Sequence, residues 1–320
     1  VLAHGFFGFD NFAGLDFVQY FFGVKARLAE LGENDVFTPA VDPFNNSTVR
    51  GLALLAEIEA ILAQTGHEKV NLIAHSQGGL DARLVAHLRA DLVASVTTIA
   101  TPHQGTEIAD VALGLIDHPA LRDVVDGLTR LIGAPIWDEL GQETSVVESL
   151  RQLSTPAMID FNREVTDGGG VAYYSIGARS DYHLGPVDCA SENSPEFVAR
   201  WRWQTDPVDP LLSVTEAILD ANMAVTVQSE VDERSESAKL QRLQTCQRVR
   251  RTLVNLGPGI ANDGLVRVRD ARWGRFLGCI PADHLDEIGQ LLGDAPGLFN
   301  PFDHLELYSE LVAWLRAQGY

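Results

Sequence analysis

Lysine, methionine and cysteine are scarce in this chain. Only Lys25, Lys69 and Lys239 are lysines, and 44 acidic residues give a formal net charge of −20. So acidic a chain argues against nucleic acid and anionic membrane surfaces as partners. No apolar run approaches the roughly 18 residues that cross a bilayer, and no internal repeat or low-complexity linker is present. With 46% hydrophobic residues, the sequence predicts one domain over residues 1–320.

Strand-like and helix-like segments alternate along the chain. Apolar runs of strand length lie at Val1–Ala3, Asp35–Pro39, Val70–Ala74, Val93–Ala100, Val171–Ile176 and Val266–Val268. Helical periodicity marks Phe17–Leu31, Val49–Gln64, Gly79–Ala90, His284–Leu292 and His304–Gln318. Strands joined by helices pair in parallel, so the fold class is α/β, with a mostly parallel, doubly wound sheet.

A serine lies where one of these strands meets a helix. Ser76 follows the run Val70–Ala74, and Ala74, Gly78 and Gly79 are small enough for strand and helix backbones to approach closely. This pattern predicts a nucleophile elbow, which exposes the serine hydroxyl at the carboxyl edge of the sheet. The alternative is an ordinary turn in which the serine caps the helix.

A serine hydroxyl needs a base and an acid, which follow it in the order Ser, Asp or Glu, His in this kind of fold. Asp263 lies in a turn before a strand-like run, and His284 lies in a loop before a helix-like run. We predict the triad Ser76, Asp263 and His284. His304 is the alternative base, and Asp263 could instead only form an Asn-Asp-Gly turn.

Two backbone N–H groups are expected to stabilise the oxyanion of such a reaction. One belongs to Gln77, directly after the serine. The other belongs to Phe6, in a loop that follows the first strand and that Gly5 and Gly8 allow to bend toward the serine. An aromatic-rich core loop without this role is the alternative.

The strand pattern stops between residues 104 and 161. Residues 121–150 indicate helices with apolar faces, and we predict that residues 105–160 form a helical lid over the site. A fixed cap packed on the core fits the same pattern.

These motifs resemble those of the secreted true lipases of Pseudomonas and Burkholderia type, in the α/β-hydrolase superfamily. The matching segments, in chain order, are residues 4–10, 70–79, 101–106, 171–175, 261–266 and 284–287. The resemblance implies an α/β-hydrolase fold with an inserted lid and a triacylglycerol lipase that is active at a lipid–water interface. It also implies a secreted monomer and a dedicated folding chaperone during secretion. Because the sequence starts inside a strand-like run and shows no signal peptide, we expect that a leader precedes it.

The resemblance further implies one structural calcium ion that fixes the loop of the catalytic histidine. Its carboxylate ligands would be Asp206 and Asp286, and its carbonyl ligands Gln290 and Asp294. Calcium takes about six to eight oxygen ligands, which this set and water can supply. The alternative is that Asp286 only caps the helix after His284.

The chain departs from the family pattern after residue 210. We expect an extra helical insertion at residues 211–258, which could displace Asp206. The three cysteines also differ in position from the family's disulfide, and three single bridges are open to them. We predict a Cys189–Cys246 bridge, with Cys279 free and buried.

The predicted activity is hydrolysis of carboxylic esters through an acyl-enzyme intermediate. The substrate is a lipid or another ester, because the triad determines the reaction but not the shape of the pocket that binds the acyl chain. A polyester depolymerase or another bulky-ester esterase is therefore the alternative enzyme. A catalytically inactive binding protein is the remote alternative.

Overall fold

The computed structural model describes most of the two ends of the chain and less of the region between them. The described residues are 1–6, 19–116, 146–180, 189, 191, 193–201, 204, 206, 212, 215–216, 219, 261–290, 296–297 and 300–320. None of the helices they form has the length and apolarity that a bilayer crossing requires.

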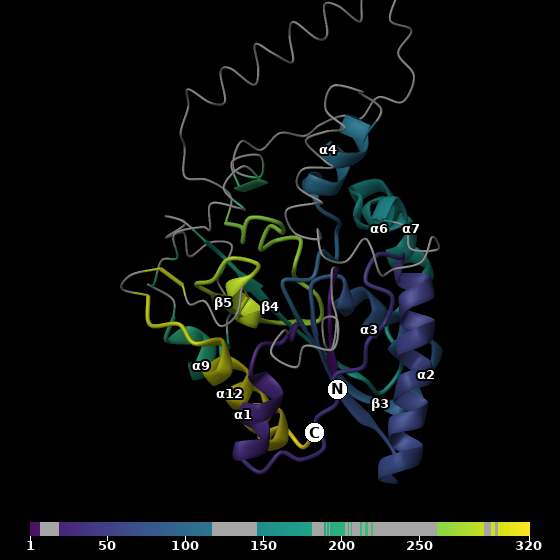
Figure 1. Cartoon of the computed structure of the whole chain (residues 1–320), viewed down its shortest axis with the longest axis vertical. Coiled ribbons are helices and arrows are strands. Elements are labelled where there is room, and N and C mark those ends of the chain that lie inside the picture. Colours follow the sequence, from purple (N-terminus) through teal and green to yellow (C-terminus); the bar gives the residue numbers. More distant parts are fainter. Residues whose placement is uncertain are drawn as a thin grey trace, which may run out of the picture.

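A five-stranded parallel sheet lies at the centre of the molecule (Figure 1). Its strands follow the order of the chain, so each pairs with the next in sequence. The strands are β1 (Leu2–Ala3), β2 (Val70–His75), β3 (Val93–Ile99), β4 (Ala172–Ala178) and β5 (Arg275–Ile280). The predicted α/β class with a parallel sheet is confirmed.

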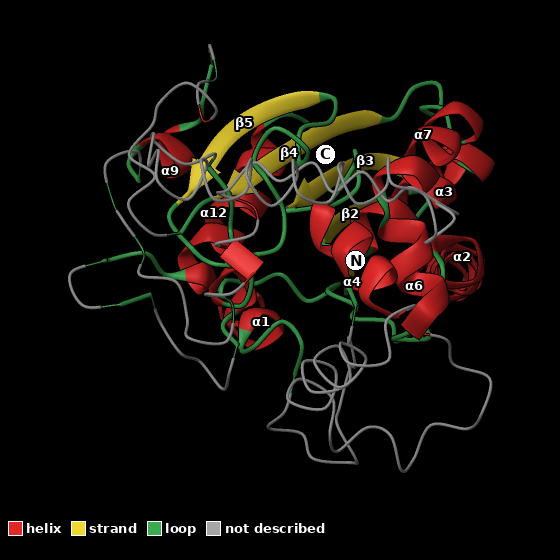
Figure 2. Ribbon diagram, turned by 90° about the horizontal axis from the view of Figure 1, so that it is seen from above, coloured by secondary structure: helices red, strands yellow, loops and turns green. Residues whose placement is uncertain are grey.

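Helices cover both faces of the sheet (Figure 2). Ile73 of β2 packs in the core cluster that includes helix residues 24, 28, 307 and 311, whereas its neighbours Leu72 and Ala74 pack in the cluster of the other face. A strand buried on both faces is typical of a parallel sheet. One face bears α1 (Val24–Glu30), α9 (Glu196–Ala199) and α12 (His304–Ala317), and the other α2 (Ser47–Thr65) and α3 (Gly78–Leu88).

Helix α2 shows how local sequence sets an element's ends. The side chain of Asn46 accepts hydrogen bonds from the backbone of Thr48 and Val49, which caps the first turn. Gly66 ends the helix with a φ of 75°, a left-handed conformation that glycine adopts without strain. The helix therefore runs slightly beyond the predicted Val49–Gln64.

Two segments that were predicted to be strands are described but do not form strands. Residues 35–39 form no strand, although the Leu2 N–H of the two-residue strand β1 donates to the Phe37 carbonyl at 2.8 Å. Residues 266–268 form a turn with an isolated bridge, because the Asp263 side chain takes the N–H of Val266 that a strand would need. Strand β5, in contrast, was not expected.

Two predicted helices are shorter than expected. The helix predicted at Phe17–Leu31 begins only at Val24, after Gly23 in a left-handed conformation. The predicted helix His284–Leu292 is reduced to a single 3-10 turn, η2 (Asp286–Ile288), which Gly289 ends at a φ of 70°. A second 3-10 turn, η1 (Ala90–Leu92), connects α3 to β3.

The predicted lid, residues 105–160, is mostly helical where it is described. It includes α4 (Glu107–Ile116), α6 (Val146–Leu153) and the start of α7 (Thr155–Glu164). Apolar side chains of these helices pack against Leu80 and Leu84 of α3. Residues 117–145 lie outside the described residues, as does most of the predicted insertion at 211–258, so both remain predictions.

Candidate active site

The turn between β2 and α3 has the geometry of a nucleophile elbow. Ser76 has a φ of 54°, which is strained for a residue with a side chain. A Cβ atom on Gly78 would lie 2.5 Å from the carbonyl oxygens of Ala3 and His4, and one on Gly79 would lie 2.1 Å from Thr101 Oγ1. The predicted need for small residues around Ser76 therefore has a steric cause.

Ser76, Asp263 and His284 come together at the carboxyl edge of the sheet. The Ser76 Oγ lies 2.9 Å from His284 Nε2, and the Asp263 Oδ2 lies 2.9 Å from His284 Nδ1. All three residues are buried. A histidine whose Nδ1–H faces a carboxylate has Nε2 free to accept a proton from the serine. The arrangement can therefore activate the Ser76 hydroxyl.

Asp263 is held by the backbone around it. Its Oδ1 accepts the N–H of Leu265 at 2.8 Å and of Val266 at 2.6 Å, and its carbonyl accepts the N–H of His284 at 2.9 Å. The turn that Asp263 forms thus also aims its second oxygen at the imidazole. The two interpretations of this residue, turn former and triad acid, are compatible.

The alternative base, His304, lies away from Ser76. Its Nε2 donates to the Phe22 carbonyl at 2.8 Å, and its ring packs so closely on Gly289 that a Cβ there would lie 2.3 Å from Nε2. His304 therefore joins α12 to the segment before α1.

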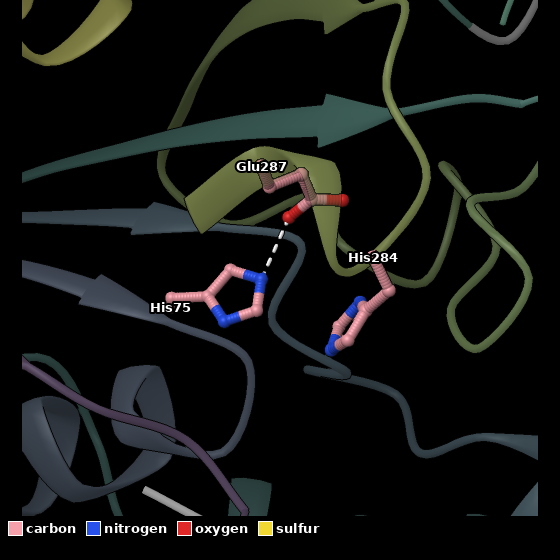
Figure 3. Close-up of side chains that lie close together, drawn as sticks. All are labelled: His75, His284 and Glu287. Carbon is pink, nitrogen blue, oxygen red and sulfur yellow. Dashed lines mark hydrogen bonds and ion pairs between the residues drawn. The ribbon is translucent and has the colours of Figure 1, made fainter. Parts of the chain in front are cut away.

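A second buried imidazole, that of His75, lies against the imidazole of His284 (Figure 3). The ring centroids of His75 and His284 are 4.5 Å apart. His75 Nε2 lies 2.8 Å from Glu287 Oε2, and His75 Nδ1 lies 2.7 Å from the Tyr20 hydroxyl. Burial lowers the pKa of His75 well below its usual value and raises the pKa of Glu287 well above its own. Sequence reasoning missed Glu287, because 212 residues separate it from His75 and no local pattern joins them.

The two predicted oxyanion donors lie on the segments that flank Ser76. Gln77 is buried and is the N-cap residue directly before α3, with its side-chain amide donating to the Asn45 carbonyl at 2.8 Å. On the other side, a Cβ atom on Gly5 would lie 2.6 Å from Ser76 Cβ. The backbone that leads to Phe6 is therefore in direct contact with the nucleophile.

Three buried carboxylates gather next to the His284 loop. One oxygen each of Asp206, Asp283 and Asp286 lies within 4.8 Å of the others. Asp206 Oδ2 accepts the Asp283 N–H at 2.6 Å, whereas Asp206 Oδ1 is buried without a hydrogen-bond partner. Burial, and then Asp283, raise the pKa of Asp206 to about 7. An orphaned oxygen among clustered acids fits a hard cation such as calcium.

The carbonyl ligands predicted for that ion are less defined. Gln290 is buried beside the cluster's loop, and its side-chain amide donates to the Tyr20 carbonyl at 3.0 Å. Asp294 lies outside the described residues. Asp283 was not predicted, although its place directly before His284 and three residues before Asp286 was a signal.

The predicted disulfide is wrong. Cys189 is bonded to Cys279, with a Cα–Cα distance of 5.2 Å, so it does not pair with Cys246 and Cys279 is not free. The prediction placed the bridge around the insertion, whereas Cys279 lies on the unexpected strand β5, whose neighbours bring it to Cys189. Cys246 itself lies outside the described residues.

The sheet and the serine elbow are those of an α/β hydrolase. A family model described as "alpha/beta hydrolase fold" matches residues 2–153. Among solved structures, lipase 1 from Pelosinus fermentans aligns with 98% of this chain and 97% of its own, at a TM-score of 0.55 and 18% identity. This likeness concerns the fold alone.

Sequence relatives define the family more closely. A triacylglycerol lipase of Pseudarthrobacter phenanthrenivorans is 32% identical over 92% of this chain and 89% of its own length. One of Burkholderia plantarii is 32% identical over 92% of this chain and 79% of its own. The chain belongs to this triacylglycerol lipase family of α/β hydrolases. It is an ester-hydrolysing enzyme, and the alternative of an inactive binding protein is set aside.

Proposed function

We propose that this enzyme hydrolyses triacylglycerols at a lipid–water interface, with Ser76 as nucleophile, His284 as base and Asp263 as the acid that orients it. The observation that supports these roles most is the continuous hydrogen-bonded line from Ser76 Oγ through His284 to Asp263, with two distances of 2.9 Å. The names of the relatives, triacylglycerol lipases, support the substrate.

The proposed reaction is a two-step acyl transfer. His284 takes the Ser76 proton as Oγ attacks the ester carbonyl, and Asp263 stabilises the imidazolium that forms. The N–H groups of Phe6 and Gln77 bind the oxyanion. His284 then gives its proton to the leaving alcohol. Water, activated by the same histidine, releases the fatty acid and restores the serine.

A substrate series tests the proposed substrate. Initial rates would be measured on triacylglycerols of increasing chain length, on p-nitrophenyl esters and on an insoluble polyester, with Ser76→Ala as the blank. We expect the highest kcat/KM on emulsified triacylglycerols. A preference for the polyester would instead make the enzyme a depolymerase on the same fold.

We also propose that residues 105–160 form a lid that opens at the interface. The apolar packing of α4, α6 and α7 on α3 supports a helical subdomain anchored beside the elbow. Opening would expose apolar surface that an interface stabilises. The rate on a short-chain triacylglycerol should therefore rise steeply at its solubility limit, whereas a hyperbolic curve through that limit would indicate a fixed cap.

A structural calcium ion is the proposed cofactor. Asp206 and Asp286 would be carboxylate ligands, Gln290 and Asp294 carbonyl ligands, and the orphaned Oδ1 of Asp206 supports a cation there. When bound, the ion would neutralise the clustered carboxylates and hold the loop of His284. Elemental analysis of dialysed, active protein checks it, and active protein without calcium would end the proposal.

Secretion is the proposed localisation, with a folding chaperone and a monomeric product. The Cys189–Cys279 disulfide supports an oxidising compartment. The refolding yield with and without a relative's chaperone tests the need for a chaperone. Light scattering of the refolded protein tests the monomeric state. Full spontaneous refolding would remove the chaperone, and a larger particle would remove the monomer.

A further inference from the structure

The peptide that joins Gly5 to Phe6 is held from its carbonyl side. His4 Nδ1 lies 3.0 Å from the Gly5 oxygen, and Arg50 Nη2 lies 3.3 Å from the same atom. A trans peptide is planar, so its C=O and its N–H point in opposite directions. Whatever fixes the Gly5 oxygen therefore also sets the direction of the Phe6 N–H.

The protonation state of His4 suits this contact. The backbone N–H of Val41 donates to His4 Nε2 at 3.0 Å, so the ring proton is on Nδ1 and faces the Gly5 oxygen. Burial lowers the pKa of His4 to about 3, and the charge of Arg50 adds to the shift. The ring is therefore a neutral donor of one fixed tautomer at the pH where the base His284 must be unprotonated.

Arg50 connects the same peptide to the helix behind the nucleophile. It is fully buried in α2, and its guanidinium donates to Asp81 Oδ2 of α3 at 2.8 Å and to the His4 carbonyl at 2.7 Å. A positive charge beside the Gly5 carbonyl polarises the peptide and makes the N–H at its other end a stronger donor. Arg50 thus acts on both the direction and the strength of that group.

Packing leaves this peptide little freedom to turn. A Cβ on Gly5 would lie 2.6 Å from Ser76 Cβ and 2.6 Å from the Tyr20 hydroxyl. The Tyr20 hydroxyl is in turn hydrogen-bonded to His75, the residue directly before Ser76. The loop backbone is therefore enclosed between the nucleophile and a buried tyrosine, with its carbonyl turned toward α2.

We infer that His4 and Arg50 are positioning residues for the oxyanion site: they hold the Gly5 carbonyl so that the Phe6 N–H is aimed and polarised toward the developing negative charge. The inference rests on the proposed function of Phe6 and Ser76. Because the oxyanion forms only in the transition state, loss of this hold should lower kcat and leave KM nearly unchanged.

The test compares His4→Phe with His103→Phe, a matched control. His103 is equally buried and its pKa is also lowered by burial, but its nitrogens bond to Thr98 and Arg83 instead of the oxyanion loop. Rates would be measured on a p-nitrophenyl ester and on its thionoester, in which sulfur replaces the carbonyl oxygen and accepts hydrogen bonds more weakly.

We expect His4→Phe to lower kcat on the ester about tenfold to hundredfold, with KM changed less than about threefold. The ratio of ester to thionoester rates should fall with it, because misaimed donors no longer favour oxygen. His103→Phe should change the melting temperature and keep the wild-type ratio. If His4→Phe does not fold, Arg50→Lys, which keeps a charge opposite Asp81, is measured in the same way.

Two results would overturn the inference: an unchanged kcat in His4→Phe, or a lost activity with the wild-type ester to thionoester ratio. The proposed function fails differently. A fluorophosphonate that does not label Ser76 in the native enzyme would remove the triad itself. Labelled Ser76 together with an unchanged ratio would remove only the role of His4 and Arg50.

Discussion

The elbow that bears Ser76 and the loop that bears His284 meet in one site but are held in different ways. The elbow is fixed by contact: Gly78 and Gly79 have no room for a Cβ. The loop is fixed by buried polar groups, with Asp283 Oδ1 accepting the N–H of Leu285 and of Asp286 and Asp206 accepting the N–H of Asp283. Small local residues determine the elbow, whereas buried carboxylates, of which Asp206 is distant in sequence, determine the loop.

This difference has a physical consequence. Steric contacts do not depend on ions, whereas carboxylates gathered in a buried place repel one another until a cation or protons neutralise them. The elbow should therefore tolerate chelators and fail only when its backbone is crowded. The stability of the His284 loop should depend on calcium and on the Cys189–Cys279 disulfide, which is attached to β5.

The largest effect should come from removing either half of the reacting pair. Ser76→Ala and His284→Ala should each lower kcat by about 10⁶, with little change in melting temperature, because the two groups act as one unit. The double variant should then be no slower than either single one. If the losses of kcat in the two single variants multiplied in the double variant, Ser76 and His284 would act independently.

Removal of the disulfide should destabilise the side of the His284 loop. Cys189 and Cys279 are 90 residues apart, and their bond constrains the unfolded chain. Cys279→Ser should lower the free energy of unfolding by about 2–5 kcal/mol, measured by urea denaturation. Cys246→Ser, which leaves the bridge intact, is the matched control. Equal losses in the two variants would contradict the assigned pairing.

Chelation should act on the loop and not on the elbow. At free calcium a hundred times the dissociation constant, the ion would stabilise the fold by about 2.7 kcal/mol, so a chelator should lower the melting temperature and the activity together. Asp206→Asn should abolish this response, whereas Asp303→Asn, which alters the N-cap of α12 and none of the three clustered carboxylates, should keep it. Magnesium should restore little, because it demands tighter octahedral geometry. A response that survives in Asp206→Asn would move the ion elsewhere.

The smallest effect should be steric. Gly79→Ala would place a methyl group 2.1 Å from Thr101 Oγ1, so the free energy of unfolding should fall by about 1–3 kcal/mol, with or without calcium. The control is Gly169→Ala, where a Cβ meets nothing within 4 Å and φ is not positive. Thermal unfolding of both variants measures the difference. If the loss of unfolding free energy in Gly79→Ala depended on calcium, the distinction between the elbow and the His284 loop would not hold.

The same distinction explains what the sequence could predict. Ser76, Asp263 and His284, which the structure brings together, could be predicted because local turns and the chain order of the residues mark them. Glu287 beside His75 was missed, since only folding brings the two together, whereas Asp283 beside Asp206 was missed although its place directly before His284 was a signal. The predicted Cys189 pairing was wrong for a related reason. The true pairing depends on strand β5, whose residues Arg275–Ile280 begin with a charged residue and are interrupted by Gly278, so they lack a clear strand pattern.

One measurement tests the central claim, that Ser76 is the nucleophile activated by His284 and Asp263. The native enzyme would be treated with a p-nitrophenyl alkylphosphonate, and the mass of the intact protein and of its peptides recorded. One phosphonyl group should be found per chain, on Ser76, with complete loss of esterase activity, and none in Ser76→Ala; His284→Ala should be labelled far more slowly. Full inactivation with the label on another residue, or rapid labelling of Ser76→Ala, would contradict the account.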